Sequence, residues 1–211
     1  SEDISSVLYE ISNAASSTED LSQLYQKIHL ALDKILDATN FFIATYDSHE
    51  DLIHFTYWVD EYTPKDTPSP VSLSERSDSI SALVMLSGKP LIFKKNELIE
   101  YWNKVNCPYQ EPVCEVWVGM PLIADSEVIG VIALQNYSDP DCYSEEDIAI
   151  LQTISKQIAF AIDRKRSQTR YQNLLKNIKD VVYTTDFQGK LNYVGDSLIE
   201  IAGYHPREGM S

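Results

Sequence analysis

The chain has 211 residues, of which 44% are hydrophobic and 23% charged, and its formal net charge is −15. This composition is typical of a globular protein that buries a core. The negative charge argues against nucleic acid as a partner, because phosphate binding requires clustered Lys and Arg. No apolar run reaches the roughly 20 residues that cross a bilayer, so we expect no direct membrane insertion.

The N-terminal third of the sequence predicts two helices followed by a strand pair. Apolar residues recur at helical spacing over residues 3–16 and 21–35. Aromatic and β-branched residues at 40–47 then predict a strand, and the polar sequence SHED leads to a partner strand at 52–62.

The middle of the chain predicts short elements between loops. Three prolines and many Ser and Thr residues predict a loop over 63–79. A short helix is expected over 79–87, with Gly88 ending it. The sequence PLIFK at 90–94 predicts an edge strand, and residues 96–103 a further short helix.

The segment GMPLIADSEVIGVIALQNY, residues 119–137, predicts a hairpin with two apolar faces. Alternation predicts Met120, Leu122, Ile132 and Leu134 on one face, and Ile123, Ile129, Val131 and Ala133 on the other. Two apolar faces are typical of central strands covered on both sides, as in a three-layer domain.

A long helix is predicted after this hairpin. Ser144 with Asp147 three residues later gives a capping signal, and the helical pattern continues without Gly or Pro to about Lys179. After Asp180 the sequence VVYTTDFQGKLNYVGDS predicts a strand, a glycine turn and a second strand.

This order of elements, with VGMPLIADSEVIGVIALQNY and YSEEDIAILQTISKQIAFAIDR, resembles a GAF domain over residues 1–165. The resemblance implies an α+β fold with three layers, α/β/α, around a central antiparallel sheet of five or six strands. It also implies a small-molecule pocket and a parallel homodimer through the terminal helices. The hairpin turn departs from the family pattern, because Ser126 stands where Gly is common.

The tail RYQNLLKNIKDVVYTTDFQGKLNYVGDSLIEIAGYHPREGM resembles the opening of a PAS domain. The resemblance predicts a helical linker at 166–180, an incomplete PAS domain at 181–211, and a longer parent protein. A GAF domain joined to a PAS domain is similar to the sensory half of bacterial sensor histidine kinases in two-component systems, and next of diguanylate cyclases. We expect a regulatory protein fragment without catalytic residues, which acts on downstream PAS and output domains.

Aromatic residues suggest where a ligand of unknown identity would bind. The predicted pocket residues are Tyr57, Trp58, Tyr62, Arg76, Trp102, Trp117 and Met120. The aromatic side chains offer walls for a planar molecule, and the arginine offers an anchor for an anion. The same residues could instead fill the core, in which case the domain would be a ligand-free structural dimerisation module.

The long helix is predicted to transmit the signal and to form the dimer. The residues predicted for this role are Leu151, Ser155, Ile158 and Ile162. A ligand with different affinities for two pocket states would bias the helix packing by that difference in free energy. The alternative interpretation is a simple tether.

The cysteines and histidines predict no cofactor or metal. Cys107, Cys114 and Cys142 form no CxxC pair, which is typical of free thiols in a cytoplasmic protein. None of the three cysteines precedes a His, as the chromophore-binding Cys of bilin-binding GAF domains typically does. The dipeptide Cys107-Pro108 is only weak evidence for haem. A GAF-type methionine sulfoxide reductase, using Cys107 and Cys114, stays a less favoured alternative. His49 and His54 belong to a polar hairpin turn, which explains them without a metal.

Overall fold

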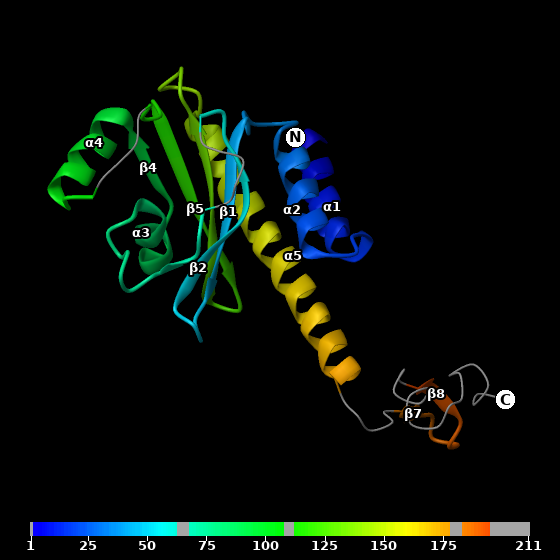
Figure 1. Ribbon diagram of the computed structural model, residues 1–211. Coiled ribbons are helices and arrows are strands. Elements are labelled where there is room, and N and C mark those ends of the chain that lie inside the picture. The colour runs from blue at the N-terminus through cyan, green and yellow to red at the C-terminus, as the bar shows by residue number, and fades with distance from the viewer. Residues whose placement is uncertain (1, 63–67, 108–111, 178–182, 195–211) are drawn as a thin grey trace. The chain divides into compact units, whose positions relative to one another are not determined.

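The computed structural model describes residues 2–62, 68–107, 112–177 and 183–194 (Figure 1). Contacts divide the chain into two compact units, Ser1–Lys165 and Arg166–Ser211. Most of the predicted PAS segment, including Gly203 and Tyr204, lies outside the described residues.

The first unit contains a six-stranded sheet in the order β3-β2-β1-β6-β5-β4, with every neighbouring pair antiparallel. The strands are β1 (Asn40–Asp47), β2 (Leu52–Val59), β3 (Val71–Ser72), β4 (Leu91–Lys94), β5 (Val116–Ala124) and β6 (Glu127–Asn136). The predicted antiparallel sheet is therefore confirmed, and the PLIFK segment forms its edge strand β4.

Helices cover both faces of this sheet, which confirms the predicted α/β/α layers (Figure 1). The helices are α1 (Glu2–Ser17), α2 (Leu21–Leu32), α3 (Ile80–Ser87), α4 (Lys95–Lys104) and α5 (Glu145–Asn177). Helices α1, α2 and α5 pack on one face, and α3 and α4 lie on the other. The Ser79 side chain caps the start of α3, and Gly88, with a backbone φ of 61°, ends this helix.

Each face of the β5–β6 hairpin belongs to a separate hydrophobic core. Met120, Leu122, Ile132 and Leu134 pack with the α1, α2 and α5 side chains. Val131 and Ala133 pack on the α3 and α4 side, as predicted. Residues of alternating parity thus reach two different cores, which is why both faces are apolar.

The prediction was wrong for Ile129. A β-bulge between Leu122 and Ile123 pairs Ile123 with Val128 and leaves Ile129 as the extra residue. An extra residue reverses the alternation locally, so Ile129 packs with the α1, α2 and α5 core. Ile123 is partly exposed, at 40%.

The turn of this hairpin has the backbone geometry that its strands require. Asp125 and Ser126 both have positive φ, 49° and 68°. Two-residue hairpin turns of the type I′ form need positive φ at both central positions, because that twist matches the flanking strands. Ser126 adopts this conformation where the family commonly places Gly.

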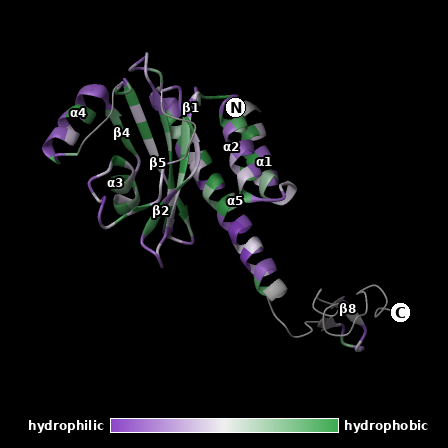
Figure 2. Cartoon of the chain, viewed as in Figure 1, coloured by the Kyte–Doolittle hydropathy of each residue, from purple (hydrophilic) through white to green (hydrophobic). Residues whose placement is uncertain are grey.

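Helix α5 begins at a capping box, as predicted. The Ser144 amide and hydroxyl donate to Asp147, and the Asp147 amide donates back to the serine hydroxyl. Figure 2 shows hydrophilic residues dominating the C-terminal part of this helix. No helix among the described residues is long and apolar enough to cross a membrane.

The second unit contains a two-stranded hairpin of β7 (Tyr183–Thr185) and β8 (Leu191–Val194). Its turn includes Gly189 at φ 83°, and the Asp186 carboxylate accepts the Gln188 and Lys190 amides. The strand, glycine turn and strand predicted after Asp180 are therefore present between residues 183 and 194.

Candidate functional site

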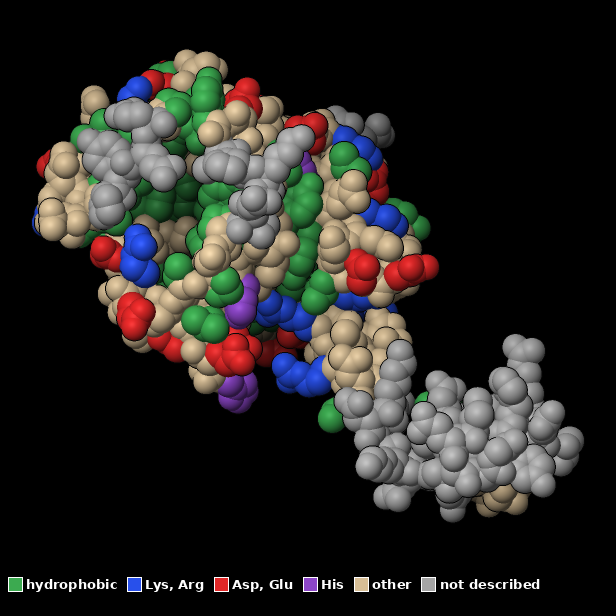
Figure 3. All heavy atoms as spheres, viewed as in Figure 1, with side chains coloured by type: hydrophobic (Ala, Val, Ile, Leu, Met, Phe, Trp, Pro, Cys, Tyr) green, Lys and Arg blue, Asp and Glu red, His purple; other side chains and the backbone are tan. Residues whose placement is uncertain are grey.

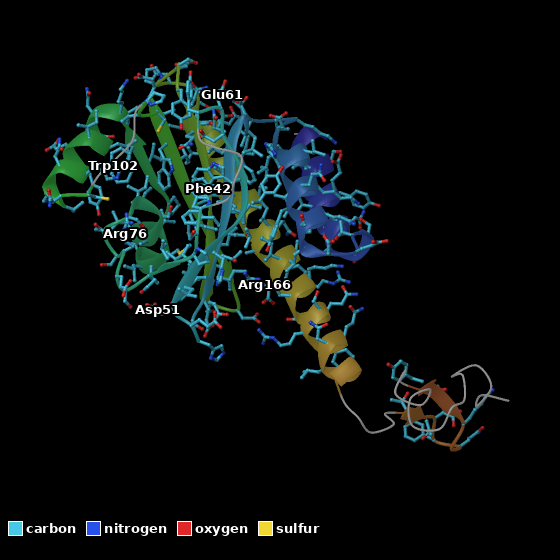
Figure 4. The ribbon with its side chains drawn as sticks, in the orientation of Figure 1. Phe42, Asp51, Glu61, Arg76, Trp102 and Arg166 are labelled. Atoms are coloured by element: carbon cyan, nitrogen blue, oxygen red, sulfur yellow. The ribbon has the colours of Figure 1, made fainter. Side chains whose placement is uncertain are left out.

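The α3 and α4 face of the sheet carries all three tryptophans of the chain. Trp117 is buried in the core of this face, and Trp58 and Trp102 pack partly buried against it. Figure 3 shows a hollow lined by hydrophobic side chains between α3, α4 and the sheet. Figure 4 shows Phe42 from β1, Trp102 from α4 and Arg76 around this region.

A β-bulge in β2 builds the aromatic cluster at this site. Ile43 pairs with Tyr57 and Ala44 with Phe55, so Thr56 is an extra residue in the strand. Strict alternation would send Phe55 and Trp58 to opposite faces, because they are three residues apart. The extra residue lets both face α3 and α4.

Phe42, Phe55 and Trp58 form one ring cluster. The Trp58 ring stacks on Phe42 with centroids 4.9 Å apart and an interplanar angle of 15°. Phe55 meets the Trp58 ring edge-on at 5.7 Å. Such offset and edge-to-face pairs are favourable arrangements of aromatic quadrupoles, and they fix the orientation of the indole.

The indole N–H of Trp58 is buried without an acceptor. Among the described residues, its Nε1 atom has no hydrogen-bond partner, although it is shielded from solvent. More than nine in ten buried polar groups in proteins find a partner, so an unsatisfied donor requires an explanation. This donor can therefore bind an acceptor that the described residues do not supply.

Charged and polar groups gather beside α3 and α4. The Arg76 Nε lies 3.5 Å from Asp78 Oδ1, and an Arg76 terminal nitrogen lies 3.6 Å from the Cys107 sulfur. The Tyr101 hydroxyl donates to the Asp78 carbonyl oxygen at 2.8 Å. Asp78 Oδ1 is shielded from solvent yet accepts no hydrogen bond from the described residues. The arginine is half exposed, so its guanidinium can reach a bound molecule.

A second polar group lies where β2 and β6 end. Asp60 Oδ2 accepts hydrogen bonds from the Tyr137 hydroxyl, at 2.9 Å, and from the Gln135 side chain. Burial and this carboxylate raise the pKa of Tyr137. The Tyr62 ring meets Tyr137 edge-on at 4.6 Å. The Asp60 carboxylate is thus already satisfied by the protein.

The structure separates Tyr57 and Met120 from the other predicted pocket residues. Both side chains pack with the α1, α2 and α5 core, on the opposite face of the sheet. The Tyr57 hydroxyl lies 2.8 Å from His29 Nδ1, and His29 Nε2 lies 2.7 Å from the Ala38 carbonyl oxygen. In the neutral imidazole, Nε2–H donates to that carbonyl and Nδ1 accepts from the tyrosine. The prediction that these two residues line one pocket with the tryptophans was wrong.

The other predicted pocket residues differ in their exposure. Trp117 is 2% exposed and covers Gly119, so it forms a wall of the site. Trp58 and Trp102 are partly exposed, and Arg76 is exposed. Tyr62 is 59% exposed and belongs to the polar group at Asp60. The structure therefore brings Trp58, Trp102 and Trp117 to one face, with Arg76 beside them.

The residues predicted for the dimer interface are buried inside the chain itself. Leu151, Ser155, Ile158 and Ile162 are between 0% and 5% exposed, and the three apolar ones belong to the core beneath the sheet. Periodicity identified a buried stripe correctly but attributed it to the wrong neighbour.

One charged residue of α5 is also buried in this face. Lys165 is 4% exposed, and its ammonium donates to the Thr18 carbonyl oxygen between α1 and α2. Thr18 in turn donates to the Ala14 carbonyl through its amide and hydroxyl. These bonds fix α5 against the turn that joins the first two helices.

Cys114 belongs to the core of the α3 and α4 face and Cys107 lies next to Arg76, whereas Cys142 packs against the other core. None of the three forms a disulfide. Burial raises the pKa of the Cys114 thiol to about 12 and that of Cys142 to about 11. In the part of the chain that the structure describes, no group of three or more His, Cys, Asp or Glu side chains could hold a metal ion.

Several residues of the site were not predicted from the sequence. They are Phe42, Phe55, Asp60, Asp78 and Tyr137. Period-two alternation from Trp58 to its cross-strand partner would have identified Phe42. The bulge at Thr56 hides Phe55 from the same reasoning.

Comparisons with known proteins agree with the fold of the first unit. A GAF domain family model matches residues 18–163. A search of curated protein sequences found no match.

Solved structures share the fold at low sequence identity. The GAF domain of an Acinetobacter phosphoenolpyruvate-protein phosphotransferase is 16% identical with a TM-score of 0.61, covering 77% of this chain and 93% of that chain. Residues 122 to 287 of a methyl-accepting chemotaxis protein are 19% identical with a TM-score of 0.58, covering 80% and 99%. Free methionine-R-sulfoxide reductase from Neisseria meningitidis, in complex with its substrate, is 13% identical with a TM-score of 0.58, covering 78% and 91%. At these identities the likeness shows the fold alone.

Proposed function

The chain belongs to the GAF domain family, and we propose that it is the ligand-sensing regulatory module of a bacterial signal-transduction protein. A small molecule binds on the α3 and α4 face, and α5 carries the response onward. The observation that supports this best is the buried, unsatisfied indole N–H of Trp58 inside an aromatic site.

The path of the signal is supported by the shared sheet. Strands β5 and β6 place Trp117 and Val131 on the ligand side, and Met120 and Ile132 on the α5 side. Close-packed layers transmit small displacements, because they have no free volume to absorb them. A ligand that binds two arrangements of this sheet differently shifts their populations by that difference in affinity.

The parent protein is proposed to be a sensor histidine kinase, with a PAS domain following α5. The support is the sequence resemblance after Asp180 and the β7–β8 hairpin within it. A homodimer, expected from the family resemblance, would use the exposed side of α5, where Phe160 is 60% exposed. The corresponding alternative parent is a diguanylate cyclase.

The proposal is tested by a thermal-shift screen of small metabolites. A ligand that binds only the folded state raises the apparent stability by mass action. Intrinsic fluorescence gives a second readout, because all three tryptophans lie on the proposed ligand face. A hit must raise the melting temperature and change the tryptophan emission together.

Failure of this screen has a defined meaning. If no molecule stabilises the protein, while sedimentation shows a dimer, the chain is a ligand-free dimerisation module. Reduction of free methionine sulfoxide that is lost on replacing Cys107 and Cys114 by Ser would instead support an enzyme. The raised thiol pKa of Cys114 works against that outcome, since the thiolate is the reactive form.

A further inference from the structure

The segment that leads from β3 into α3 has the contacts of a strap that can open. We propose that residues 71–79, the strap, open as one unit at the edge of the α3 and α4 face, and that the Asp51 carboxylate holds the strap closed. This inference rests on the proposed function only in taking that face as the side where a ligand enters.

Asp51 ties the start of the strap to the turn between β1 and β2. Its carboxylate accepts the Ser72 hydroxyl at 2.7 Å and the Ser74 amide at 3.2 Å. The same carboxylate accepts the Tyr46 hydroxyl at 3.1 Å, and the Asp51 carbonyl oxygen accepts the Leu73 amide at 3.0 Å. The backbone φ of Asp51 is 55°, which is uncommon outside Gly and persists where surrounding bonds determine it. The hydrogen bond from Ser72 is the largest cause of the lowered pKa of Asp51, so the carboxylate is ionised at neutral pH and these bonds are charge-assisted.

The hydrogen bonds of the strap form a continuous chain from Asp51 to the start of α3. The Ser72 hydroxyl, which donates to Asp51, accepts the Glu75 amide at 3.1 Å. The Ser72 carbonyl oxygen accepts the Arg76 amide at 3.0 Å, and the Arg76 carbonyl oxygen accepts the Ser79 amide at 2.9 Å. Ser79 then caps α3. Because each bond depends on the preceding one, loss of the first link should release the segment cooperatively.

The strap buries little of its own surface. Strand β3 pairs with β2 at Val71 and Ser72, and Leu73 is buried in the core of the α3 and α4 face. Residues 74–77 are exposed. A segment with few buried apolar contacts and exposed backbone hydrogen bonds opens at a lower free energy than the surrounding core. We therefore expect the strap to open while the sheet stays folded.

The far end of the strap lies against α4, beside the tryptophan site. An Arg76 terminal nitrogen lies 3.6 Å from the Cys107 sulfur, and the Tyr101 hydroxyl donates to the Asp78 carbonyl oxygen at 2.8 Å. The Cys107 thiol is buried, and its amide donates to the Trp102 carbonyl oxygen at 2.9 Å. Figure 4 shows Arg76 and Trp102 on this side of the domain. Opening of the strap should therefore uncover Cys107 and the adjoining edge of the site.

The test replaces Asp51 by Asn, which keeps the size of the side chain and tolerates positive φ but carries no charge. Asp47→Asn in the same turn is the matched control, because the Asp47 carboxylate accepts the His49 and Glu50 amides within the turn itself. Hydrogen exchange of the ¹⁵N-labelled full chain is followed amide by amide. Alkylation of Cys107 by iodoacetamide, measured at one pH by peptide mass spectrometry, gives the second readout.

In Asp51→Asn, the Ser74 amide should exchange about tenfold faster or more, because hydrogen bonds to a charged group are lost. The Arg76 and Ser79 amides should accelerate by the same factor, although their own acceptors are carbonyl oxygens of the strap. Alkylation of Cys107 should accelerate by this factor as well, because the thiol reacts from the open form. A common factor distinguishes cooperative opening from the loss of one local hydrogen bond.

A second variant and the control complete the test. Ser72→Ala removes a hydroxyl from the same link, so it should accelerate the same amides and Cys107 together, by a smaller factor. Asp47→Asn should leave both readouts unchanged. The proposal is overturned if Asp51→Asn accelerates the Ser74 amide alone, if the strap amides accelerate without Cys107, or if Asp47→Asn has the same effect. Should Asp51→Asn not fold, the same criteria apply to Ser72→Ala.

Failure of the strap and failure of the proposed function give different results. If a metabolite stabilises the protein in the thermal-shift screen while the strap amides exchange independently, the sensing function stands and the strap is overturned. If the strap opens cooperatively and no metabolite stabilises the protein, the strap stands and the sensing function is overturned.

Discussion

Neighbouring residues of β2 reach opposite faces of the sheet, and the two faces satisfy their polar atoms differently. Tyr57 points to the α1, α2 and α5 side, where His29 pairs with its hydroxyl. Trp58 points to the α3 and α4 side, where the described residues offer its N–H no acceptor. The first face pairs this polar side chain within the chain, whereas the second leaves the Trp58 donor without an acceptor among the described residues.

The composition of the two faces follows the same division. The α1, α2 and α5 face is built mainly from aliphatic side chains that interlock between helices and strands. The other face combines three tryptophans with Arg76, Asp78 and Asp60 at its margins.

The largest expected difference concerns thiol reactivity on and beside the α3 and α4 face. With a pKa raised to about 12, the Cys114 thiolate fraction at pH 8 is roughly a thousandfold below that of an ordinary cysteine. Greater intrinsic nucleophilicity returns part of this loss. We expect alkylation of Cys114 by iodoacetamide to be roughly a hundredfold slower in the folded than in the urea-unfolded protein. Peptide mass spectrometry measures each cysteine separately, and equal rates would show an accessible, reactive thiol.

Truncation of a buried side chain on the α1, α2 and α5 face should cost the most stability. Ile158 is 0% exposed beneath the sheet, so Ile158→Ala should lower the free energy of unfolding by about 3 kcal/mol through lost burial and a cavity. Urea denaturation provides the measurement. Leu86→Ala on α3, where the side chain is 60% exposed, is the control, and should change stability by no more than about 0.5 kcal/mol. Dissociation of a dimer by Ile158→Ala without loss of stability would contradict the assignment.

The substitution Gly119→Ala adds a methyl group that should disturb the α3 and α4 face specifically. A Cβ there would lie 2.2 Å and 2.6 Å from two ring carbons of Trp117. The indole must move, and overpacking of this kind costs about 1–3 kcal/mol. The tryptophan emission should change in the folded protein, while the far-ultraviolet circular dichroism stays the same. An unchanged emission spectrum would show that Trp117 does not rest on Gly119.

The smallest expected effect compares the two neighbours of β2 directly. Tyr57→Phe removes the partner of His29 Nδ1 and should cost about 1 kcal/mol. Trp58→Phe removes an unsatisfied donor as well as ring surface, so the two terms oppose each other. We expect its stability without ligand to change by less than Tyr57→Phe changes it. A larger loss for Trp58→Phe would mean that removing the unsatisfied donor does not offset the lost ring surface.

The sequence predicts the elements and layers of this fold better than the neighbours of individual side chains. The stop signal at Gly88, the capping signal at Ser144 and the two-faced hairpin were sufficient to place α3, α5 and the central strands. Alternation alone could have separated Tyr57 from Trp58. The bulges at Thr56 and Ile129 could not be predicted, because an extra strand residue leaves no periodic signal.

The predicted dimer residues show a different limit. An apolar stripe at helical spacing identifies a buried face, but it does not identify the surface that buries it. For α5, that surface is the sheet and the first two helices of the same chain. Only the three-dimensional arrangement distinguishes this case from a coiled coil.

The hydrogen bond of the buried Lys165 ammonium fixes the rotation of α5 about its axis at this residue. Up to this residue the helix is held against Thr18, and beyond it each residue turns the chain by about 100° and advances it by about 1.5 Å. Each residue inserted after Arg166 therefore rotates and displaces the following part of the helix by a fixed amount. One added residue should change the rotational position of the segment after the insertion, and with it any response that α5 transmits. Seven added residues should nearly restore that position. A response that varies smoothly with insertion length, without this periodicity, would show that α5 transmits distance and not rotation.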